Sequence, residues 1–526
     1  MRTSNAAWSL AGLVAGGAGL ATSYLTANVM NIRESPVVAV AELVIRHTPG
    51  AVTERAIDVL GHNDKPALVA GILVLLAALF LLVGRLARHR WWVAVGILGL
   101  LAGFGALAVL TRRGSTAADA LPVLVGLATW LIVLALLTER LRRIDRLVED
   151  DDTTTHEPGP DEPRPMLTDE QRHGRRGFLI GVGVIAVLAG AIGVIGRIAG
   201  SGRRKVEEAR RLLRLDGVST PAVPPDTKLG VDGVTSWMTP ADEFYLIDTA
   251  VIVPAIEPKD WTLRIHGMVE NEVELSYDEL VAREITESWV TLNCVSNEVG
   301  GDLIGNAWWS GVRLADILAQ VGLDPEADAV LQTSDDGWTC GTPLSALTDD
   351  RNAMLAVAMN GKPLPIEHGF PVRTLVPGLY GYVSACKWVV DMEVTRFDRI
   401  SAFWTEKGWG EMGPVKMSSR IDVPRSGDEV PGGAVTFAGM AWSQHTGIEG
   451  VEVAIDGGPW EAAELAGVPN DDTWVQWKAV VEVASGDHMV KVRATDKNGV
   501  VQTGVEADVL PDGATGWHSV DFSVRG

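Results

Sequence analysis

Thr291-Leu-Asn-Cys-Val-Ser-Asn-Glu-Val-Gly-Gly301 places one cysteine between an apolar, β-prone run and a loop of small and polar residues. The run predicts a strand, so the thiol of Cys294 sits at a rigid strand end that a bulky ligand can approach closely. The chain has three cysteines in all, which excludes a zinc cluster or an iron–sulfur set. Cys294 is then a buried packing thiol, a nucleophile or a single ligand to a soft metal.

The first 200 residues contain five apolar segments, each close to the length of about 20 residues that crosses a bilayer. We therefore expect a multi-pass membrane protein in contact with lipid. Four transmembrane helices are predicted in residues 1–147 and a fifth in residues 178–200. The predicted spans are residues 7–25, 67–83, 91–110, 120–137 and 178–195.

Arginines in the connecting segments predict the orientation in the cell membrane. Positive residues stay on the cytoplasmic side, whereas Arg112 and Arg113 favour the opposite orientation and are outnumbered. The N-terminus is then cytoplasmic, and the chain beyond residue 200 lies outside the cytoplasm. The arginines that decide this are Arg85, Arg88, Arg90, Arg140, Arg142, Arg143, Arg146, Arg172, Arg175 and Arg176.

Residues 148–177 are acidic and rich in threonine and proline, which predicts a disordered cytoplasmic linker. Near its end, Arg175-Arg176-Gly-Phe-Leu-Ile resembles the twin-arginine address that exports folded proteins. Folded export would suit a cofactor inserted in the cytoplasm. The alternative is that these arginines only flank the fifth span.

Charge and histidine placement exclude two classes. A formal net charge of −22 argues against a nucleic-acid partner. None of the ten histidines falls inside a predicted span, so the spans offer no paired ligands for a haem of their own. The predicted spans also contain almost no ionisable residues. This favours a role as a simple membrane anchor over a separate module that faces a quinone.

The second half of the chain changes its pattern at about residue 425. Residues 220–424 mix strand-like and helix-like periods. From 425 to 526 only short strands separated by turns such as Asp456-Gly-Gly are predicted. We expect a multi-domain chain: transmembrane α-helices, an α+β domain at 220–424 and an Ig-like β-sandwich at 425–526.

An ordered set of motifs carries a family resemblance. The block from Phe244 to about Arg425 resembles the molybdopterin domain of the sulfite oxidase family. The β-rich tail is similar to the Ig-like domain that follows it and forms the dimer contact in many members, which implies a homodimer. The motifs are Cys294-Val-Ser-Asn, Gly300-Gly-Asp-Leu-Ile-Gly-Asn, Trp309-Ser-Gly-Val, Ser334-Asp-Asp-Gly, Asn360-Gly-Lys-Pro-Leu-Pro, His368-Gly-Phe-Pro-Val-Arg373, Pro377-Gly-Leu-Tyr-Gly and Lys387-Trp.

The resemblance implies a molybdenum ion with one pyranopterin, bound through the thiolate of Cys294. His368 and Arg373 would line the pterin and its phosphate, since arginine suits fork-like phosphate binding. Surface salt bridges are the alternative for both. The other implied contacts are Thr333, Ser384 and Lys387 for hydrogen bonds and charge, and Tyr245 to cap the pterin or simply pack in the core.

The remaining cysteines, Cys340 and Cys386, lie in apolar surroundings and are interpreted as packing thiols. A disulfide between them is possible and is not implied. A cysteine hydrolase is the weaker alternative for Cys294, because no motif supplies a histidine or aspartate partner.

Departures from the family pattern bear on the substrate. Sulfite-oxidising relatives follow Asn297 with arginine and carry another arginine near Tyr245, whereas this chain has Glu298, Val299 and Asp248. Each such charge is worth on the order of 1–4 kcal/mol in a partly buried pocket. We therefore expect a neutral or cationic oxide, such as a sulfoxide or N-oxide, as in the methionine sulfoxide reductases of the superfamily, rather than sulfite.

The predicted activity is oxygen-atom transfer on a small oxide, with a separate redox partner: a quinone, a cytochrome or a haem membrane subunit. Asn297 and Asp335 are the further catalytic candidates. Glu298, Asp335 and Asp336 would assist proton transfer if they face the metal, and are otherwise solvated loop residues. The open alternatives are a sulfite dehydrogenase and a non-catalytic or electron-transfer-coupled binding module on the pterin scaffold.

Overall fold

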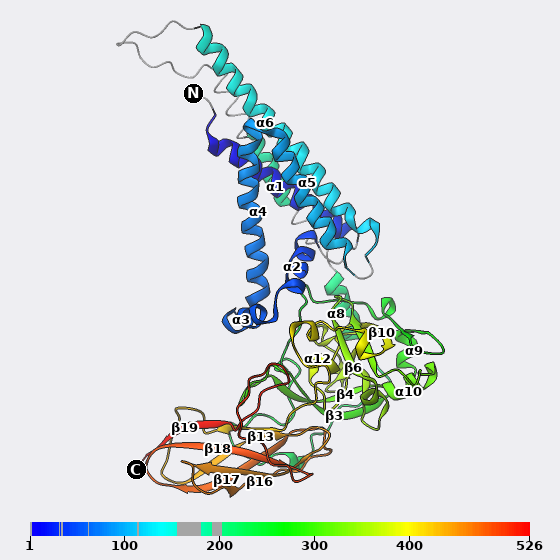
Figure 1. The fold of residues 1–526 in the computed structure, drawn as a ribbon, viewed down its shortest axis with the longest axis vertical. Coiled ribbons are helices and arrows are strands. Elements are labelled where there is room, and N and C mark those ends of the chain that lie inside the picture. Colours follow the sequence, from blue (N-terminus) through cyan, green and yellow to red (C-terminus); the bar gives the residue numbers. More distant parts are fainter. Residues whose placement is uncertain are drawn as a thin grey trace. The chain divides into compact units, whose positions relative to one another are not determined.

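The structure is a computed structural model that describes residues 3–30, 32, 35–60, 63–112, 115–154, 180–191 and 202–525. The chain divides into two compact units, Met1–Arg203 and Arg204–Gly526, which are coloured along the sequence in Figure 1. The twin arginines Arg175 and Arg176, with most of the predicted linker, lie outside the described residues.

The first unit is helical, and four of its helices are long and apolar enough to cross a membrane. They coincide with the first four predicted spans. The described part of the fifth span is a shorter apolar helix, Ile180–Ala191. Two helices, α2 and α3, were not predicted, and α6 continues into the first residues of the predicted linker. The helices are α1 (Asn5–Val29), α2 (Pro36–His47), α3 (Gly50–Leu60), α4 (Asp64–His89), α5 (Trp91–Leu110) and α6 (Leu121–Thr154).

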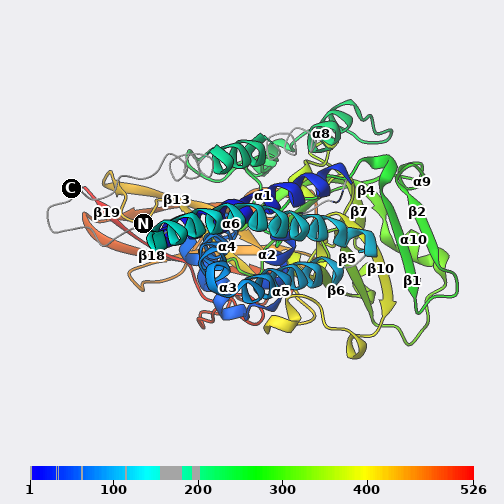
Figure 2. The same cartoon turned by 90° about the horizontal axis from the view of Figure 1, so that it is seen from above.

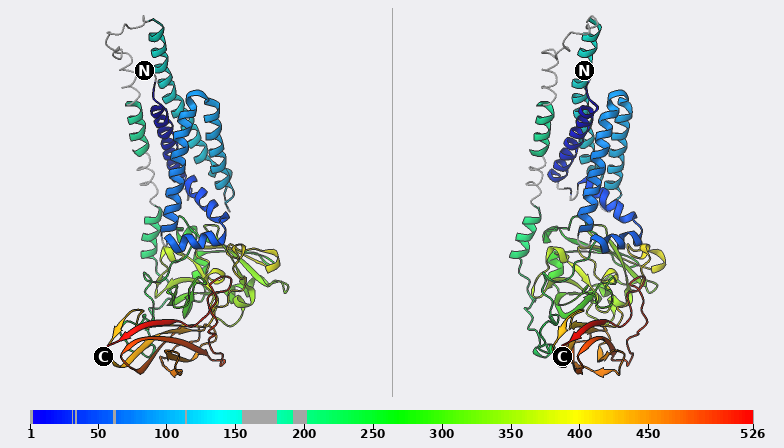
Figure 3. Two further views of the ribbon diagram at one scale, coloured as in Figure 1. Left: turned by 60° about the vertical axis from the view of Figure 1, so that its left-hand side comes forward. Right: turned by 90° about the vertical axis from the view of Figure 1, so that its left-hand side faces the viewer.

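Small residues let α1 approach its neighbours, α4 and α6, closely (Figure 3). A Cβ atom added at Gly12 would overlap the carbonyl oxygen of Phe80 in α4, and one added at Gly84 would overlap backbone atoms of α1. On the α6 side, the indole Nε1 of Trp130 donates to the carbonyl of Gly16 at 3.0 Å. Close backbone packing of this kind is how apolar helices associate where burial from water offers little driving force.

The second unit begins with α8 (Gly202–Leu212) and continues into two five-stranded sheets. The first has the order β2-β1-β10-β5-β6, with β1 parallel to β10 and the other pairs antiparallel. Its strands are seen from above in Figure 2. They are β1 (Thr262–Gly267), β2 (Val273–Ser276), β5 (Ala329–Ser334), β6 (Thr339–Pro343) and β10 (Val389–Thr395).

The second sheet has the order β3-β4-β7-β8, with β9 also paired to β7. Apolar residues of the two sheets and of three short helices, α9, α10 and α11, form the buried cores of this domain. The elements are β3 (Thr286–Asn293), β4 (Ile304–Arg313), β7 (Met354–Met359), β8 (Lys362–Pro363), β9 (Arg373–Leu375), α9 (Tyr277–Val281), α10 (Leu314–Val321), α11 (Leu344–Thr348) and α12 (Gly381–Ser384).

The C-terminal part is a β-sandwich whose two sheets share one core, in which Phe437 of one sheet packs against Phe522 of the other with ring centroids 5.3 Å apart. It begins at β11, slightly before the predicted boundary at residue 425. That it is of the Ig type stays a prediction. One sheet contains β11 (Ser418–Val423), β13 (Gly433–Trp442), β17 (Val475–Val483) and β16 (Glu464–Leu465), and the other β12 (Glu429–Val430), β19 (Ser519–Val524), β18 (Gly486–Asp496), β14 (Ile448–Ile455) and β15 (Glu461–Ala462).

A cluster of tryptophans joins the sandwich to the α+β domain. The indole of Trp237 donates to the carbonyl of Trp474 at 3.1 Å, and the indole of Trp474 donates to the carbonyl of Trp237 at 2.8 Å. Trp237 belongs to the segment that precedes the α+β domain. The amide of Leu229 and the carbonyl of Thr235, in the same segment, also bond the side chain of Gln476 in β17. The segment 229–237 therefore runs along the sandwich before the chain enters β1.

The close approach of α1 and α4 generates a testable expectation. Gly12→Leu should lower the melting temperature of the detergent-purified chain, because overpacking costs about 1–3 kcal/mol. Gly17→Leu is the matched control, since a Cβ at Gly17 in the same helix meets nothing within 4 Å. Equal melting temperatures for the two variants would contradict the packing described for α1.

Candidate functional site

Cys294 follows the last residue of β3 and is 9% exposed, whereas Cys340 and Cys386 are fully buried. Its amide donates to the carbonyl of Leu303 at 2.9 Å, and its carbonyl accepts the amide of Asn297 at 3.1 Å. The side-chain oxygen of Asn297 accepts the amide of Leu303 at 2.8 Å. The turn 294–303 is therefore closed by its own hydrogen bonds and holds the least buried of the three cysteines.

The sulfur of Cys294 is surrounded by donors. Burial raises the pKa of its thiol, while hydrogen bonds from the amide and hydroxyl of Ser296 and from the amide of Val295 lower it. Donors aimed at a sulfur favour its negative form, and a soft metal binds the thiolate. The arrangement fits a metal-ligating cysteine better than a packing thiol.

Arg373 at the start of β9 is a buried cation, 3% exposed. Its guanidinium lies over the ring of Trp309 at 5.2 Å and donates to the carbonyls of His368 at 3.2 Å and Thr374 at 3.4 Å. Within the described residues it forms no ion pair with a carboxylate, and burial lowers its pKa to about 10. A buried charge with only neutral partners is costly, so this site is built for an anion.

His368 and Lys387 stand beside Arg373. Nε2 of His368 lies 2.9 Å from the carbonyl of Ala241, and burial together with the charges of Arg373 and Lys387 lowers the pKa of His368 to about 4. Nζ of Lys387 pairs with Asp248 at 3.0 Å. Residues 373 and 387 also form an isolated β-bridge, so these side chains belong to one cationic cluster.

Tyr245 connects that cluster to Cys294. Burial raises the pKa of Tyr245 well above its usual value, Cys294 raises it further and Arg373 lowers it, so both groups lie near enough to act on the hydroxyl electrostatically. A Cβ added at Gly381 would lie 3.6 Å from this hydroxyl and 3.7 Å from the carbonyl of Asn293, the residue before Cys294. Its ring stacks on Phe244 with centroids 5.3 Å apart, and Phe244 meets His368 edge to face at 5.7 Å. The predicted residues Cys294, Tyr245, His368, Arg373 and Lys387 thus come together.

The other predicted residues occupy structural positions, and their functional roles stay predictions. Asn297 closes the cysteine turn with its amide oxygen. The hydroxyl of Ser384 is shared by the carbonyls of Leu379 and Tyr380. Thr333 is buried in β5, and the amide of Asp335 donates to the carbonyl of Trp388 at 2.8 Å.

Tyr380 was not predicted as a site residue, although it lies in the motif Pro377-Gly-Leu-Tyr-Gly. Burial, followed by the nearby Cys294 and Asp512, raises the pKa of Tyr380 to about 12, against the hydrogen bond from the amide of Lys416, which lowers it. Its oxygen accepts the amide of Lys416 at 3.3 Å. Tyr380 lies between Gly378 and Gly381, and glycines of this kind indicate a turn, so the sequence did not point to Tyr380 as a site residue.

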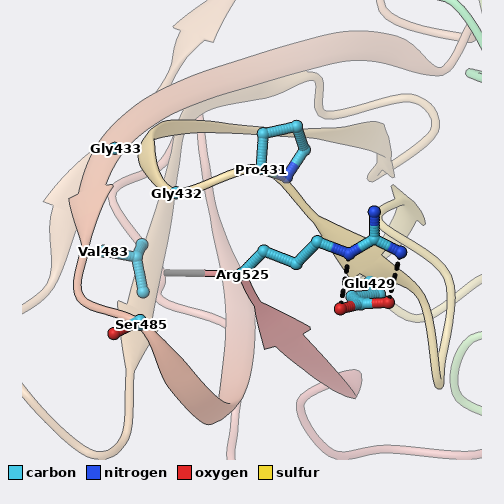
Figure 4. Close-up of a pocket in the computed structure, with 7 residues that line it drawn as sticks. All are labelled: Glu429, Pro431, Gly432, Gly433, Val483, Ser485 and Arg525. Atoms are coloured by element: carbon cyan, nitrogen blue, oxygen red, sulfur yellow. Dashed lines mark hydrogen bonds and ion pairs between the residues drawn. The ribbon is translucent and has the colours of Figure 1, made fainter.

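Two open cavities lie on the second unit. One, of about 610 Å³, is lined by Glu298 and Val299 of the cysteine turn and by residues 506–509 and 514–519 of the sandwich. The other, of about 630 Å³, lies at the end of the sandwich (Figure 4). There Arg525 is paired with Glu429 at 2.6 Å, and none of the predicted site residues contributes to it.

The fold and the site define a class of protein: one that holds an anionic cofactor over a buried cationic cluster beside a thiol suited to a soft metal. Residues 250–404 match the family model described as "Oxidoreductase molybdopterin binding domain". The uncharacterized oxidoreductase YuiH of Bacillus subtilis (strain 168) is 35% identical over 161 residues, which cover 31% of this chain and 78% of that protein.

The chain therefore belongs to the molybdopterin-binding oxidoreductases of sulfite oxidase type, and the predicted family is confirmed. Human mitochondrial sulfite oxidase is 30% identical over 306 residues, 49% of this chain and 56% of that enzyme, so the chain spans about half the length of such curated relatives. Among solved structures, the sulfane dehydrogenase SoxCD of Paracoccus pantotrophus aligns with 23% identity and a TM-score of 0.44, over 55% of this chain and 81% of that chain.

Molybdenum–molybdopterin is the cofactor that this family implies, and the residues present fit it. Arg373 offers a buried positive charge without a carboxylate partner among the described residues, as a pterin phosphate requires. Cys294 offers the soft ligand, with hydrogen-bond donors around its sulfur.

His368 generates a pH prediction for the cofactor-free chain. Its pKa in the folded state, about 4, lies below the unfolded value near 6.5. The unfolded chain therefore binds the proton first, and stability present above pH 6.5 is lost as the pH falls towards 4. In denaturant titrations in detergent, the stability advantage of the wild type over His368→Gln should shrink by about 3 kcal/mol across that range.

The control for that measurement is His488→Gln. The side-chain hydrogen bond to Asp456 raises the pKa of His488, so its contribution is present at low pH and lost as the pH rises, which is the opposite trend. A wild-type advantage over His368→Gln that stays constant with pH would show that His368 titrates normally.

Proposed function

We propose that the protein is a membrane-anchored molybdenum-cofactor oxidoreductase that transfers an oxygen atom to or from a small oxide outside the cytoplasm. The observation that carries this proposal is the juxtaposition of Cys294, the least buried of the three cysteines, with the buried cation Arg373, both of which act on the pKa of Tyr245. A scaffold kept only for binding would not need both a soft ligand and a desolvated cationic cluster.

When bound, the cofactor supplies a two-electron metal centre that exchanges an oxygen atom with the substrate. The protein binds and orients it. Cys294 holds the metal, while Arg373, Lys387 and neutral His368 hold the pterin and its phosphate. Tyr245, stacked on Phe244, covers the space between the two ends of the site and excludes water from it.

The charges near Cys294 support a neutral or cationic substrate. Glu298, on the turn after Cys294, is exposed and lines a cavity with Glu506 and Asp508. Asp512 lies close enough to Tyr380 and Tyr382 to raise the pKa of both hydroxyls. The nearby ammonium group of Lys416 is engaged by the carbonyl of Gly513 at 3.0 Å. A dianion approaching this surface meets carboxylates, each worth on the order of 1–4 kcal/mol.

A sulfite dehydrogenase is the second candidate, because the chain is 30% identical to human mitochondrial sulfite oxidase over the matched residues. The helical unit supports membrane anchoring, and the arginine pattern supports a catalytic domain outside the cytoplasm. A separate redox partner, either a quinone, a cytochrome or a haem membrane subunit, would carry the electrons. Dimerisation through the sandwich also belongs to this proposal.

The metal assignment is tested by Cys294→Ser. This variant should lose at least about 99% of oxygen-transfer activity, because a hydroxyl is a poor ligand for a soft metal, while its melting temperature and pterin content stay close to wild type. Turnover and molybdenum content of the purified protein are the measurements. Cys340→Ala, at a fully buried thiol, is the control that should stay active. Full activity of Cys294→Ser would overturn the assignment.

The substrate assignment is tested by a panel of a sulfoxide, an N-oxide and sulfite. The wild type should turn over the sulfoxide or N-oxide and be poor with sulfite. Glu298→Arg should raise kcat/KM for sulfite about tenfold, since two unit charges change beside the site, and leave neutral substrates nearly unaffected. Glu284→Arg, at another exposed position of the same domain, should change neither the kcat/KM for sulfite nor that for neutral substrates. A wild type that favours sulfite would establish the dehydrogenase instead.

A further inference from the structure

Two residues of the β-sandwich hold the turn that carries Cys294. Nη1 of Arg420 in β11 donates to the carbonyl of Gly301 at 2.7 Å. The ring of His518 packs so closely on Gly300 that a Cβ added there would overlap it, and Gly300 has a φ of +81°. The turn is thus fixed from outside by a domain that supplies none of the predicted cofactor-binding residues.

The guanidinium of Arg420 is held in one position by burial and by its other hydrogen bonds. Arg420 is 6% exposed, and its remaining nitrogens are engaged: Nε donates to Asp422 at 2.7 Å and Nη2 donates to the hydroxyl of Thr235 at 2.8 Å. The planar guanidinium makes its hydrogen bonds in a fixed fork. The position of the Gly301 carbonyl is therefore set by β11 and by the segment that contains Thr235.

His518 is also held in one orientation, since Nδ1 of its ring accepts the amide of Ile421 at 3.0 Å. Ile421 follows Arg420 in β11, so both contacts with the turn come from one place in the sandwich. Burial, followed by the charge of Arg420, lowers the pKa of His518, and the ring that packs on Gly300 is neutral.

The turn transmits its position to the thiol. Gly301 donates to the carbonyl of Glu298 at 2.9 Å, and the Asn297 side chain together with Leu303 closes the turn on Cys294. A shift at Gly301 therefore moves the sulfur. The geometry points to the β-sandwich as a positioning element of the metal ligand: Arg420 and His518 set the place of Cys294, an inference that rests on the proposed role of Cys294.

The consequence is that a residue in another domain controls the site without touching the substrate. Displacement of a reacting centre by about 1 Å can cost about 10²-fold in rate. Loss of the Arg420 contact should therefore lower kcat while KM changes little, because the substrate-facing side chains remain in place.

The first test uses the cofactor-free full-length chain and iodoacetamide, and it requires no turnover. Cys294, 9% exposed, is the least buried of the three cysteines, and fully buried Cys340 and Cys386 serve as internal controls. In Arg420→Gln, alkylation of Cys294 followed by mass spectrometry should be at least about tenfold faster than in the wild type, with Cys340 and Cys386 still unmodified. The alkylation rate of Cys294 in Arg420→Lys should lie between those of the wild type and Arg420→Gln.

The matched control is Arg493→Gln. Arg493 in β18 pairs with Glu452 at 2.8 Å and lies over Trp460, so its loss weakens the sandwich without touching the turn. Wild-type alkylation is expected for this control. If Arg420→Gln and Arg493→Gln accelerate alkylation equally, or if Arg420→Gln leaves the rate within twofold of wild type, the positioning role is refuted.

The second test uses the molybdenum-loaded enzyme. Arg420→Gln should change the electron paramagnetic resonance signal of the metal and lower kcat about tenfold or more, whereas Arg493→Gln keeps both. If Arg420→Gln fails to fold, Thr235→Val retains Arg420 and removes the hydrogen bond from its Nη2, and a smaller change of the same kind is expected. An unchanged signal and kcat in a folded variant would overturn the inference. A wild type without molybdenum would instead refute the proposed function.

Discussion

The second unit depends on one constraint: the guanidinium of Arg373 is buried without a carboxylate among the described residues. Such a charge persists because the surroundings lower its cost through the ring of Trp309 and the carbonyls of His368 and Thr374. The aromatic residues that surround it also shield it from water. Burying this charge carries an electrostatic cost that an anion bound beside the guanidinium would reduce. In the role proposed for Arg373, cofactor binding and domain stability are therefore linked.

Sequence patterns predicted four apolar helices and the start of the β-rich part, because both rest on strong periodic signals. Four apolar helices coincide with the first four predicted spans, and the change to a purely β pattern lies within a few residues of β11. The helices α2 and α3 were missed because, at 12 and 11 residues, they are too short to be identified as membrane spans. Their existence depends on local capping and packing that a hydropathy pattern does not contain.

The site residues were predicted from motifs. The motifs did not predict which side chains form hydrogen bonds or ion pairs with them. Cys294, His368 and Arg373 were predicted because each lies in a recognisable run, and their functional roles stay predictions. Asp248 was singled out only because relatives carry an arginine in this stretch. Its ion pair with Lys387 joins residues far apart in the chain, so the motifs did not predict it. Contacts between domains, such as that of Arg420 with Gly301, are not indicated by the local sequence, because nothing in the residues around either partner points to the other.

The segment before the α+β domain gives the chain an unusual path. Trp237 and Trp474 exchange indole–carbonyl bonds, and Gln476 bonds the same segment at two points. The chain from α8 onward is held first by the α+β domain, where Val206 is buried and the amide and hydroxyl of Ser219 donate to Glu287, and only then by the sandwich. Mechanically, tension applied along the chain from its N-terminal side would load these contacts of Val206 and Ser219 before it reached the hydrogen bonds at Gln476 in β17.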